Sequence, residues 1–129
     1  MTDFMKSMSA ASSGMAAQTA RLRITAENIA NADTPGYRRK IVPFEQVMDA
    51  QGTARVATGQ LFLDKNDLAR IHDPSHPMAA SAGYYDGSNV NLVVEIADSR
   101  EAQRSFEANL KIFDQARKMA SSLLDLLRR

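Results

Sequence analysis

The chain has 129 residues, of which 44% are hydrophobic and 24% are charged, and its 16 basic and 15 acidic residues give a formal net charge of +1. This length fits one domain, or one small domain with extensions. The balanced charge provides neither the clustered basic footprint of a nucleic-acid-binding protein nor the polybasic patch of a membrane-surface protein. The lack of cysteine excludes disulfides, thiolate chemistry and zinc–thiolate sites. It fits a reducing cytosol, and equally a chain that stays unfolded during export.

The first twenty residues contain only isolated apolar side chains and lack the continuous apolar core of a signal peptide. No run approaches the roughly 18 apolar residues of a membrane span. By these rules alone we expect a cytoplasmic protein, although an export route without a cleaved signal is invisible to them.

The segment from about Asp3 to Ala32 is predicted to form an amphipathic helix. Its apolar stripe repeats every seven residues at Met8, Met15, Leu22 and Ile29, and the adjacent row holds Phe4, Ala11, Gln18 and Thr25. Gly14 is a weak spot, costing about 1 kcal/mol relative to alanine. Because the stripe is narrow and rich in small side chains, this helix needs a packing partner.

The helix must end near Asp33. Thr34 precedes Pro35, and a residue before proline is pushed out of the helical region. Pro35 and Gly36 suit the two central positions of a type II turn, because glycine accepts a positive φ without strain.

The middle of the chain, from about residue 37 to 88, lacks a helical pattern. Its first apolar cluster, Ile41, Val42, Phe44 and Val47, is predicted to be extended or a single helical turn. Short strands are expected at Arg55–Thr58 and Gln60–Leu63, with Gly59 between them. Several proline and glycine breakers follow, so we expect an irregular β-containing region with long loops.

The segment from about Val90 to Arg129 is the strongest helix prediction, because it contains neither glycine nor proline. One heptad row holds Leu92, Ser99, Phe106, Phe113, Ala120 and Leu127, and the next holds Ile96, Gln103, Leu110, Arg117 and Leu124. The face between them carries acid-to-base pairs at i,i+4, namely Glu107–Lys111, Asp114–Lys118 and Asp125–Arg129. A helix this long needs a partner along most of its length.

These segments predict a mainly α fold. Residues 1–33 and 89–129 form a helical core, in which the two long terminal helices pair as a coiled coil, and residues 34–88 form a small irregular insert. Small and polar residues interrupt both seams, so surplus apolar surface is expected to seek other subunits.

No pattern in the chain supports chemistry. His72 and His76, beside Asp73, have the spacing of a helical metal site, but intervening prolines prevent the helix, so local hydrogen bonds are expected instead. Asp64–Asp67 resembles a calcium loop but lacks the required glycine and glutamate. Phosphate-binding loops and nucleophile elbows are absent. We therefore expect no catalytic, metal or cofactor site and no small-molecule ligand.

Arg38–Lys40 is a short basic run after the turn. Two interpretations stay open from the residues alone: a solvated loop, or a contact with an acidic neighbouring subunit.

Several stretches carry a family resemblance. They are residues 28–40 (Asn-Ile-Ala-Asn-Ala-Asp-Thr-Pro-Gly-Tyr-Arg-Arg-Lys), 9–15, 18–22, 72–77, 88–93 and 104–109. Together they resemble the rod and hook proteins of the bacterial flagellum, and the short middle region is similar to that of the proximal rod members. The resemblance covers nearly the whole chain.

The resemblance implies a structural subunit of the proximal rod that assembles with copies of itself and with other rod proteins into a torque-transmitting shaft. It also implies passage through the flagellar type III export apparatus and a place in the periplasmic part of the basal body. The expected assembly residues on the helices are Phe4, Met8, Met15, Leu22, Ile29, Leu92, Ile96, Phe106, Leu110, Phe113, Leu124 and Leu127. The expected motif and turn residues are Asn28, Asn31, Thr34, Pro35, Gly36 and Tyr37.

Two other classes of function are alternatives to a rod subunit. A cytoplasmic helical adaptor or chaperone-like binding protein would also present paired amphipathic helices. An enzyme would need a catalytic constellation, which the sequence lacks.

Overall fold

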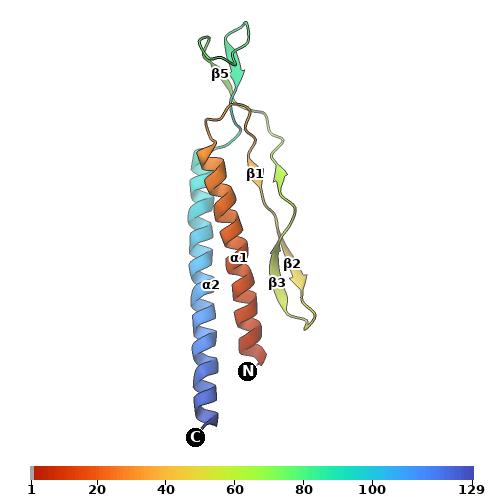
Figure 1. Cartoon of the computed structure of the whole chain (residues 1–129), viewed down its shortest axis with the longest axis vertical. Helices are drawn as coiled ribbons and strands as arrows, with labels where there is room; N and C mark the ends of the chain where they lie inside the picture. The colour runs from red at the N-terminus through yellow and green to blue at the C-terminus, as the bar shows by residue number, and fades with distance from the viewer. Residues whose placement is uncertain (1) are drawn as a thin grey trace.

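The computed structural model describes residues 2–129. Two long helices dominate this part of the chain, α1 (Thr2–Ala30) and α2 (Leu92–Leu127). They lie side by side and run in opposite directions, so both termini are at the same end of the molecule (Figure 1). The predicted mainly α fold with paired terminal helices is confirmed.

Both helices end where local chemistry requires it. Helix α1 ends at Ala30, three residues before the expected end near Asp33, and the chain then turns through Thr34–Tyr37. The start of α2 is capped by Asn91, whose side-chain oxygen accepts hydrogen bonds from the backbone N–H groups of Val93 at 3.1 Å and Val94 at 3.4 Å. Such a cap satisfies N–H groups that have no partner within the helix.

Short antiparallel strand pairs make up the middle region. Their bounds are β1 (Lys40–Ile41), β2 (Phe44–Met48), β3 (Ala54–Thr58), β4 (Phe62–Leu63), β5 (Arg70–His72) and β6 (Tyr84–Asp86). Within residues 2–129 they form the two-stranded sheets β1–β4, β2–β3 and β5–β6. The first apolar cluster is therefore extended, and the expected strands around Gly59 are present. Strands β5 and β6 were not predicted, and β5 holds His72, which we expected in a loop.

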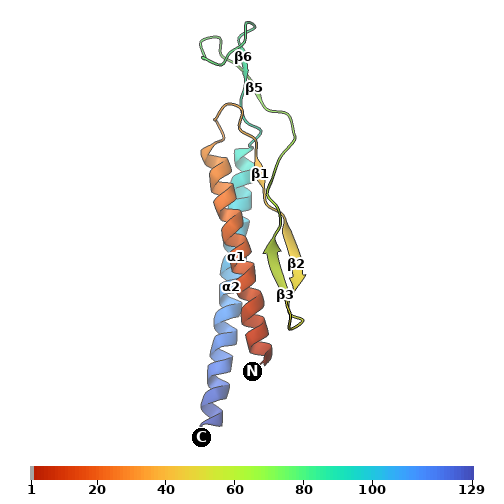
Figure 2. The same cartoon turned by 45° about the vertical axis from the view of Figure 1, so that its right-hand side comes forward.

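The sheets flank the helix pair rather than covering it. The β2–β3 hairpin lies along α1, on a different side from α2, while the β5–β6 hairpin extends beyond the ends of both helices (Figure 2). Helix α1 is therefore the central element, between α2 and the β2–β3 hairpin.

The interior is thin and unusually polar. The buried apolar residues are mostly small, namely Ala11, Ala17, Ile24, Ala102, Ala116 and Ala120. The largest fully buried side chains are instead Asn28 and Glu95, each 1% exposed. Because buried polar groups are costly unless hydrogen-bonded, these two side chains require hydrogen-bond partners within the fold.

Candidate functional site: the helix pair and its polar junction

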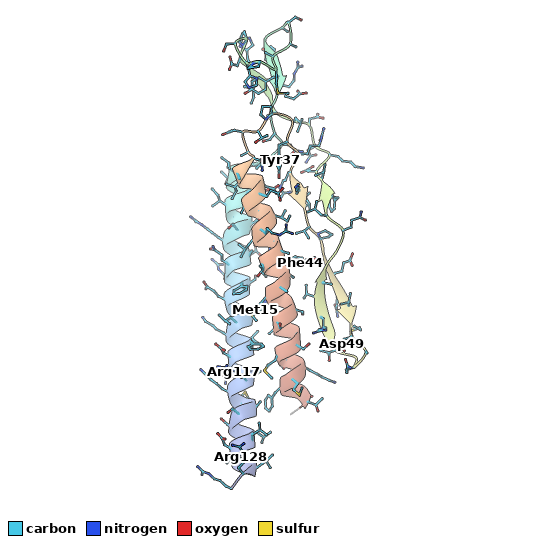
Figure 3. The ribbon with its side chains drawn as sticks, in the orientation of Figure 1. Met15, Tyr37, Phe44, Asp49, Arg117 and Arg128 are labelled. Atoms are coloured by element: carbon cyan, nitrogen blue, oxygen red, sulfur yellow. The ribbon has the colours of Figure 1, made fainter. Side chains whose placement is uncertain are left out.

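The turn after α1 has the predicted geometry. The N–H of Tyr37 donates to the carbonyl of Thr34 at 3.2 Å, and Gly36 has a φ of 73°. These values match a type II turn with Pro35 and Gly36 in its centre. The turn brings Tyr37 back to the end of the helix pair (Figure 3).

Asn28 lies at the centre of this junction and uses its full hydrogen-bonding capacity. Its Oδ1 accepts from the Tyr37 hydroxyl at 2.8 Å and from the N–H of Lys40 at 2.9 Å. Its Nδ2 donates to the carbonyl of Lys40 at 2.9 Å and to the Glu95 carboxylate at 3.3 Å. One side chain thus joins α1, the turn, strand β1 and helix α2, which explains why asparagine and tyrosine occur together in this motif.

Charged groups surround Asn28. The guanidinium of Arg39 contacts the buried Glu95 carboxylate and also Asp98, the latter at 3.2 Å. Arg21 of α1 pairs with Asp98 at 3.3 Å. The buried charge of Glu95 is therefore both paired and hydrogen-bonded, as a buried carboxylate requires. We call Arg21, Asn28, Tyr37, Arg39, Glu95 and Asp98 the polar junction.

The basic run Arg38–Lys40 is not a freely solvated loop, and the other interpretation, a contact with an acidic neighbouring subunit, stays a prediction. Arg39 pairs within the chain, Lys40 contacts Glu27, and Arg38 donates to the carbonyls of Asp64 at 3.1 Å and Asn66 at 3.0 Å. The partners of Arg39 were missed because Glu95 and Asp98 lie more than fifty residues away from it in the sequence. An acidic residue on the apolar side of a predicted helix was the available signal.

The junction perturbs two titrations. Burial, with a smaller contribution from the Glu27 carboxylate, raises the pKa of the Tyr37 hydroxyl above its ordinary value. The hydrogen bond to Glu27 raises the pKa of Lys40. Both groups therefore hold their protons more tightly in the folded chain.

The other motif residues have local roles. The Asn31 amide donates to the carbonyl of Glu27 at 2.9 Å and accepts from the Thr34 hydroxyl at 3.1 Å. Asn31 therefore closes the end of α1, while Asn28 connects distant elements.

The predicted stripe of α1 lies partly covered along the helix pair. Its members Met8, Met15, Leu22 and Ile29 are all half-buried, as is Phe4 of the adjacent row. Gly14 explains how closely the helices approach, because a Cβ atom there would lie 2.8 Å from Nδ2 of Asn109 on α2. The predicted weak spot is thus a point of close helix contact.

Only one of the two rows predicted for α2 lies in the seam. Phe106 and Phe113 are half-buried against α1, but the second seam row is Glu95, Ala102, Asn109 and Ala116. The row Ile96, Leu110 and Leu124 is 42–47% exposed. Close helix approach favours small side chains in the seam, so the larger aliphatic row is left outside the helix pair.

The C-terminal end of α2 extends past α1. Since Gly14 lies against Asn109 in an antiparallel pair, Thr2 is level with about Ser121. Beyond it, Leu124, Leu126 and Leu127 are 47%, 67% and 75% exposed. Leu92, at the other end of α2, is 45% exposed.

The expected i,i+4 pairs on α2 are not formed. Among residues 2–129, the ion pairs join Arg21, Arg39 and Lys40 to their acidic partners, and none lies within α2. Exposed long side chains gain little from such pairing, so they remain solvated.

The histidines have local partners. His72 packs against Tyr84 with ring centroids 4.7 Å apart, and His76 stacks on Tyr85 at 3.9 Å. In the part of the chain that the structure describes, no group of three or more His, Cys, Asp or Glu could hold a metal ion. No helix within residues 2–129 is long and apolar enough to cross a membrane.

Comparisons with known proteins show the family to which the chain belongs. The family model "Flagella basal body rod protein" matches residues 8–38, and "Flagellar basal body rod FlgEFG protein C-terminal" matches residues 81–126. The flagellar basal-body rod protein FlgC of Agrobacterium fabrum is 44% identical, over 92% of this chain and 91% of its own. The chain belongs to the FlgC family of flagellar basal-body rod proteins.

Other FlgC proteins agree. Those of Salmonella typhimurium and Borreliella burgdorferi are each 31% identical, over 90% and 94% of this chain and over 92% and 95% of their own chains. Membership of the FlgC family makes this chain a structural protein of the flagellar rod type. The two matched ranges contain most of both helices and all of the polar junction except Arg39.

Proposed function

We propose that the chain is a subunit of the proximal rod of the flagellar basal body, where it assembles with copies of itself and with other rod subunits to transmit torque. The observation that carries this proposal is the uncovered apolar surface of α2 in a chain of the FlgC family. Ile96, Leu110 and Leu124 repeat at helical spacing yet are 42–47% exposed. A row of this kind fits a helix that meets further helices in an assembly.

We further propose the division of labour within the chain. Residues 1–33 and 89–129 form the axial core, and residues 34–88 form the middle region. The position of the polar junction supports this boundary, because Arg39 and Tyr37 leave the core there and are tied back to Glu95 and Asn28.

Localisation in the periplasmic rod, after export through the flagellar type III apparatus without a cleaved signal peptide, follows from the proposed role. We also propose that the chain has no catalytic activity and binds no nucleic acid, cofactor or small molecule. Its role is mechanical, and the assembly contacts are its function.

The test changes one exposed member of the free row. Leu110→Asp places a charge where a neighbouring helix would pack, so we expect loss of motility and of completed basal bodies while export continues. Gln115→Asp, at an exposed polar position of the same helix, is the matched control and should leave motility unchanged.

Far-UV circular dichroism of both purified variants checks that the helix pair persists, since Leu110 is already 42% exposed. Normal motility with Leu110→Asp would contradict the assembly role of this row. A stable small oligomer confined to the cytoplasm, with none of the chain in the cell envelope, would support the adaptor alternative instead.

A further inference from the structure

The β2–β3 hairpin stands on its edge against α1. The N–H of Val56, in β3, donates to the Ser13 hydroxyl of α1 at 3.1 Å. The register pairs Phe44 with Thr58 and Val47 with Arg55, and neighbouring residues of a strand point to opposite faces. The edge of β3 therefore faces α1, and neither face of this two-stranded sheet packs flat on the helix.

The two faces differ in side-chain size. One face, which we call the Phe44 face, holds Phe44, Gln46, Met48, Ala54, Val56 and Thr58. Its large apolar members Phe44, Met48 and Val56 are 39%, 62% and 37% exposed. The opposite face, which we call the Val47 face, holds Glu45, Val47, Arg55 and Ala57.

A groove of about 430 Å³ runs between the hairpin and α1, and its hairpin side is lined by Val47, Arg55 and Ala57 of the Val47 face together with Val56 and Thr58 of β3. On the α1 side it is lined by small residues alone, namely Ser13, Ala16, Ala17 and Ala20. A smaller hollow of about 350 Å³ lies on the Phe44 face, with Ala10 as its α1 residue. Large apolar side chains thus project on one side of the hairpin, and a groove with a small-residue floor opens on the other.

A two-stranded hairpin is marginal in water unless further strands or a helix cover it. Here α1 meets only its edge, so the apolar side chains of both faces lack a cover within the described chain. The net charge of +1 gives copies of the chain little mutual repulsion. The projecting face and the groove belong to the same chain on opposite sides, which is the arrangement of a heterologous, head-to-tail contact between identical subunits.

We propose that the Phe44 face of one copy packs into the groove on the Val47 face of a second copy, so that the hairpin adds a lateral subunit contact to those of the helices. This inference rests on the proposed rod function, because a heterologous contact repeats from copy to copy. The chief contact joins Phe44 of one copy to the floor of Ala16 and Ala20 in the next.

The chain contains no cysteine, so introduced thiols report on this contact without background. Two differently tagged full-length chains, one Phe44→Cys and one Ala20→Cys, are produced together in cells that lack the unsubstituted chain, and basal bodies are isolated after mild oxidation. A disulfide needs Cβ atoms about 3.5–4.5 Å apart, so only a close contact will cross-link. Met48→Cys replaces Phe44→Cys if the latter does not assemble, because Met48 lies on the same face and is more exposed.

We expect a disulfide-linked heterodimer carrying both tags, and no dimer when either variant is produced alone. Gln51→Cys, at the exposed tip of the hairpin, is the matched control and should not link to Ala20→Cys. Motile cells whose basal bodies contain both chains without the heterodimer would overturn this inference and leave the proposed function intact. A dimer of Phe44→Cys alone would replace it with a symmetric contact. Absence of the unsubstituted chain from isolated basal bodies would overturn both proposals.

Discussion

Replacing Asn28 with alanine tests whether the polar junction holds the two helices together. The substitution removes four hydrogen bonds, which reach the Tyr37 hydroxyl, both backbone groups of Lys40 and the Glu95 carboxylate. At about 1 kcal/mol each, these bonds account for about 4 kcal/mol of stability.

Two corrections apply to this sum. Buried groups of Lys40 and Glu95 that lose their partner add about 1–3 kcal/mol each, although water entering the space left by the amide recovers part of that cost. Alanine also gains several tenths of a kcal/mol in helix propensity over asparagine. We therefore expect Asn28→Ala to lower the free energy of unfolding by about 3–5 kcal/mol.

Urea unfolding of the purified chain, followed by circular dichroism of the helices, measures this loss. Asn31→Ala is the matched control in the same motif, because Asn31 makes only the local bonds to Glu27 and Thr34. Its expected cost is about 1 kcal/mol. Equal losses for the two variants, or a loss of under about 1 kcal/mol for Asn28→Ala, would refute the reasoning that Asn28 connects the elements.

The remaining predictions concern the turn, the helix contact and alkaline pH. Gly36→Val should cost about 1–2 kcal/mol in urea unfolding through its φ of 73° alone, since no atom lies near the added Cβ, and an unchanged midpoint would exclude the type II turn. Gly14→Ala should lower stability by about 1 kcal/mol in the natural chain but raise it by a similar amount when Asn109 is also alanine, and the same sign in both backgrounds would contradict the close contact. Because the folded-state pKa values of Tyr37 and Lys40 are raised, their stabilisation is present below about pH 10 and is lost as pH rises through those values. The urea concentration at the unfolding midpoint should therefore decrease as the pH is raised beyond about 10, and this decrease should be less steep with Tyr37→Phe. A midpoint that increases over this pH range would contradict the assigned sign.

Local sequence chemistry was sufficient to predict the two helices and the turn that follows α1. The stop after α1 depends on Pro35 and Gly36, whose backbone preferences hold in any context. That Met8, Met15 and Leu22 share one face likewise follows from the geometry of a single helix. Predictions of this kind need no knowledge of distant residues.

The seam of α2 could not be predicted by hydrophobicity. Ranking rows by apolar content favours Ile96, Leu110 and Leu124, whereas the structure uses Glu95, Ala102 and Asn109. Small residues in the seam of α2 fit the close approach of the helices at Gly14. A buried Glu95 is tolerated only because Arg39 and Asn28, from other parts of the chain, pair with its carboxylate.

The same reason explains the missed role of the basic run. A charge run is usually a solvated surface, and the acidic partners of Arg39 in this chain are brought to it only by the pairing of the helices. Strands β5 and β6 were missed because three residues carry too short a pattern for a period of two to be recognised.

The polar junction has a consequence for sliding of the two helices past each other. A seam built from heptad rows offers alternative alignments, because a shift of seven residues, or about 10 Å, again brings similar rows together. The polar junction opposes such a shift. Displacement by one heptad would separate Glu95 from both Asn28 and Arg39, and it would leave the Asn28 amide without its hydrogen bond to Glu95. The junction therefore fixes the axial register of the two helices at one end of the pair, where the heptad rows alone would permit more than one alignment. Under a force directed along the helix axes, the two helices of a subunit would therefore keep the same register.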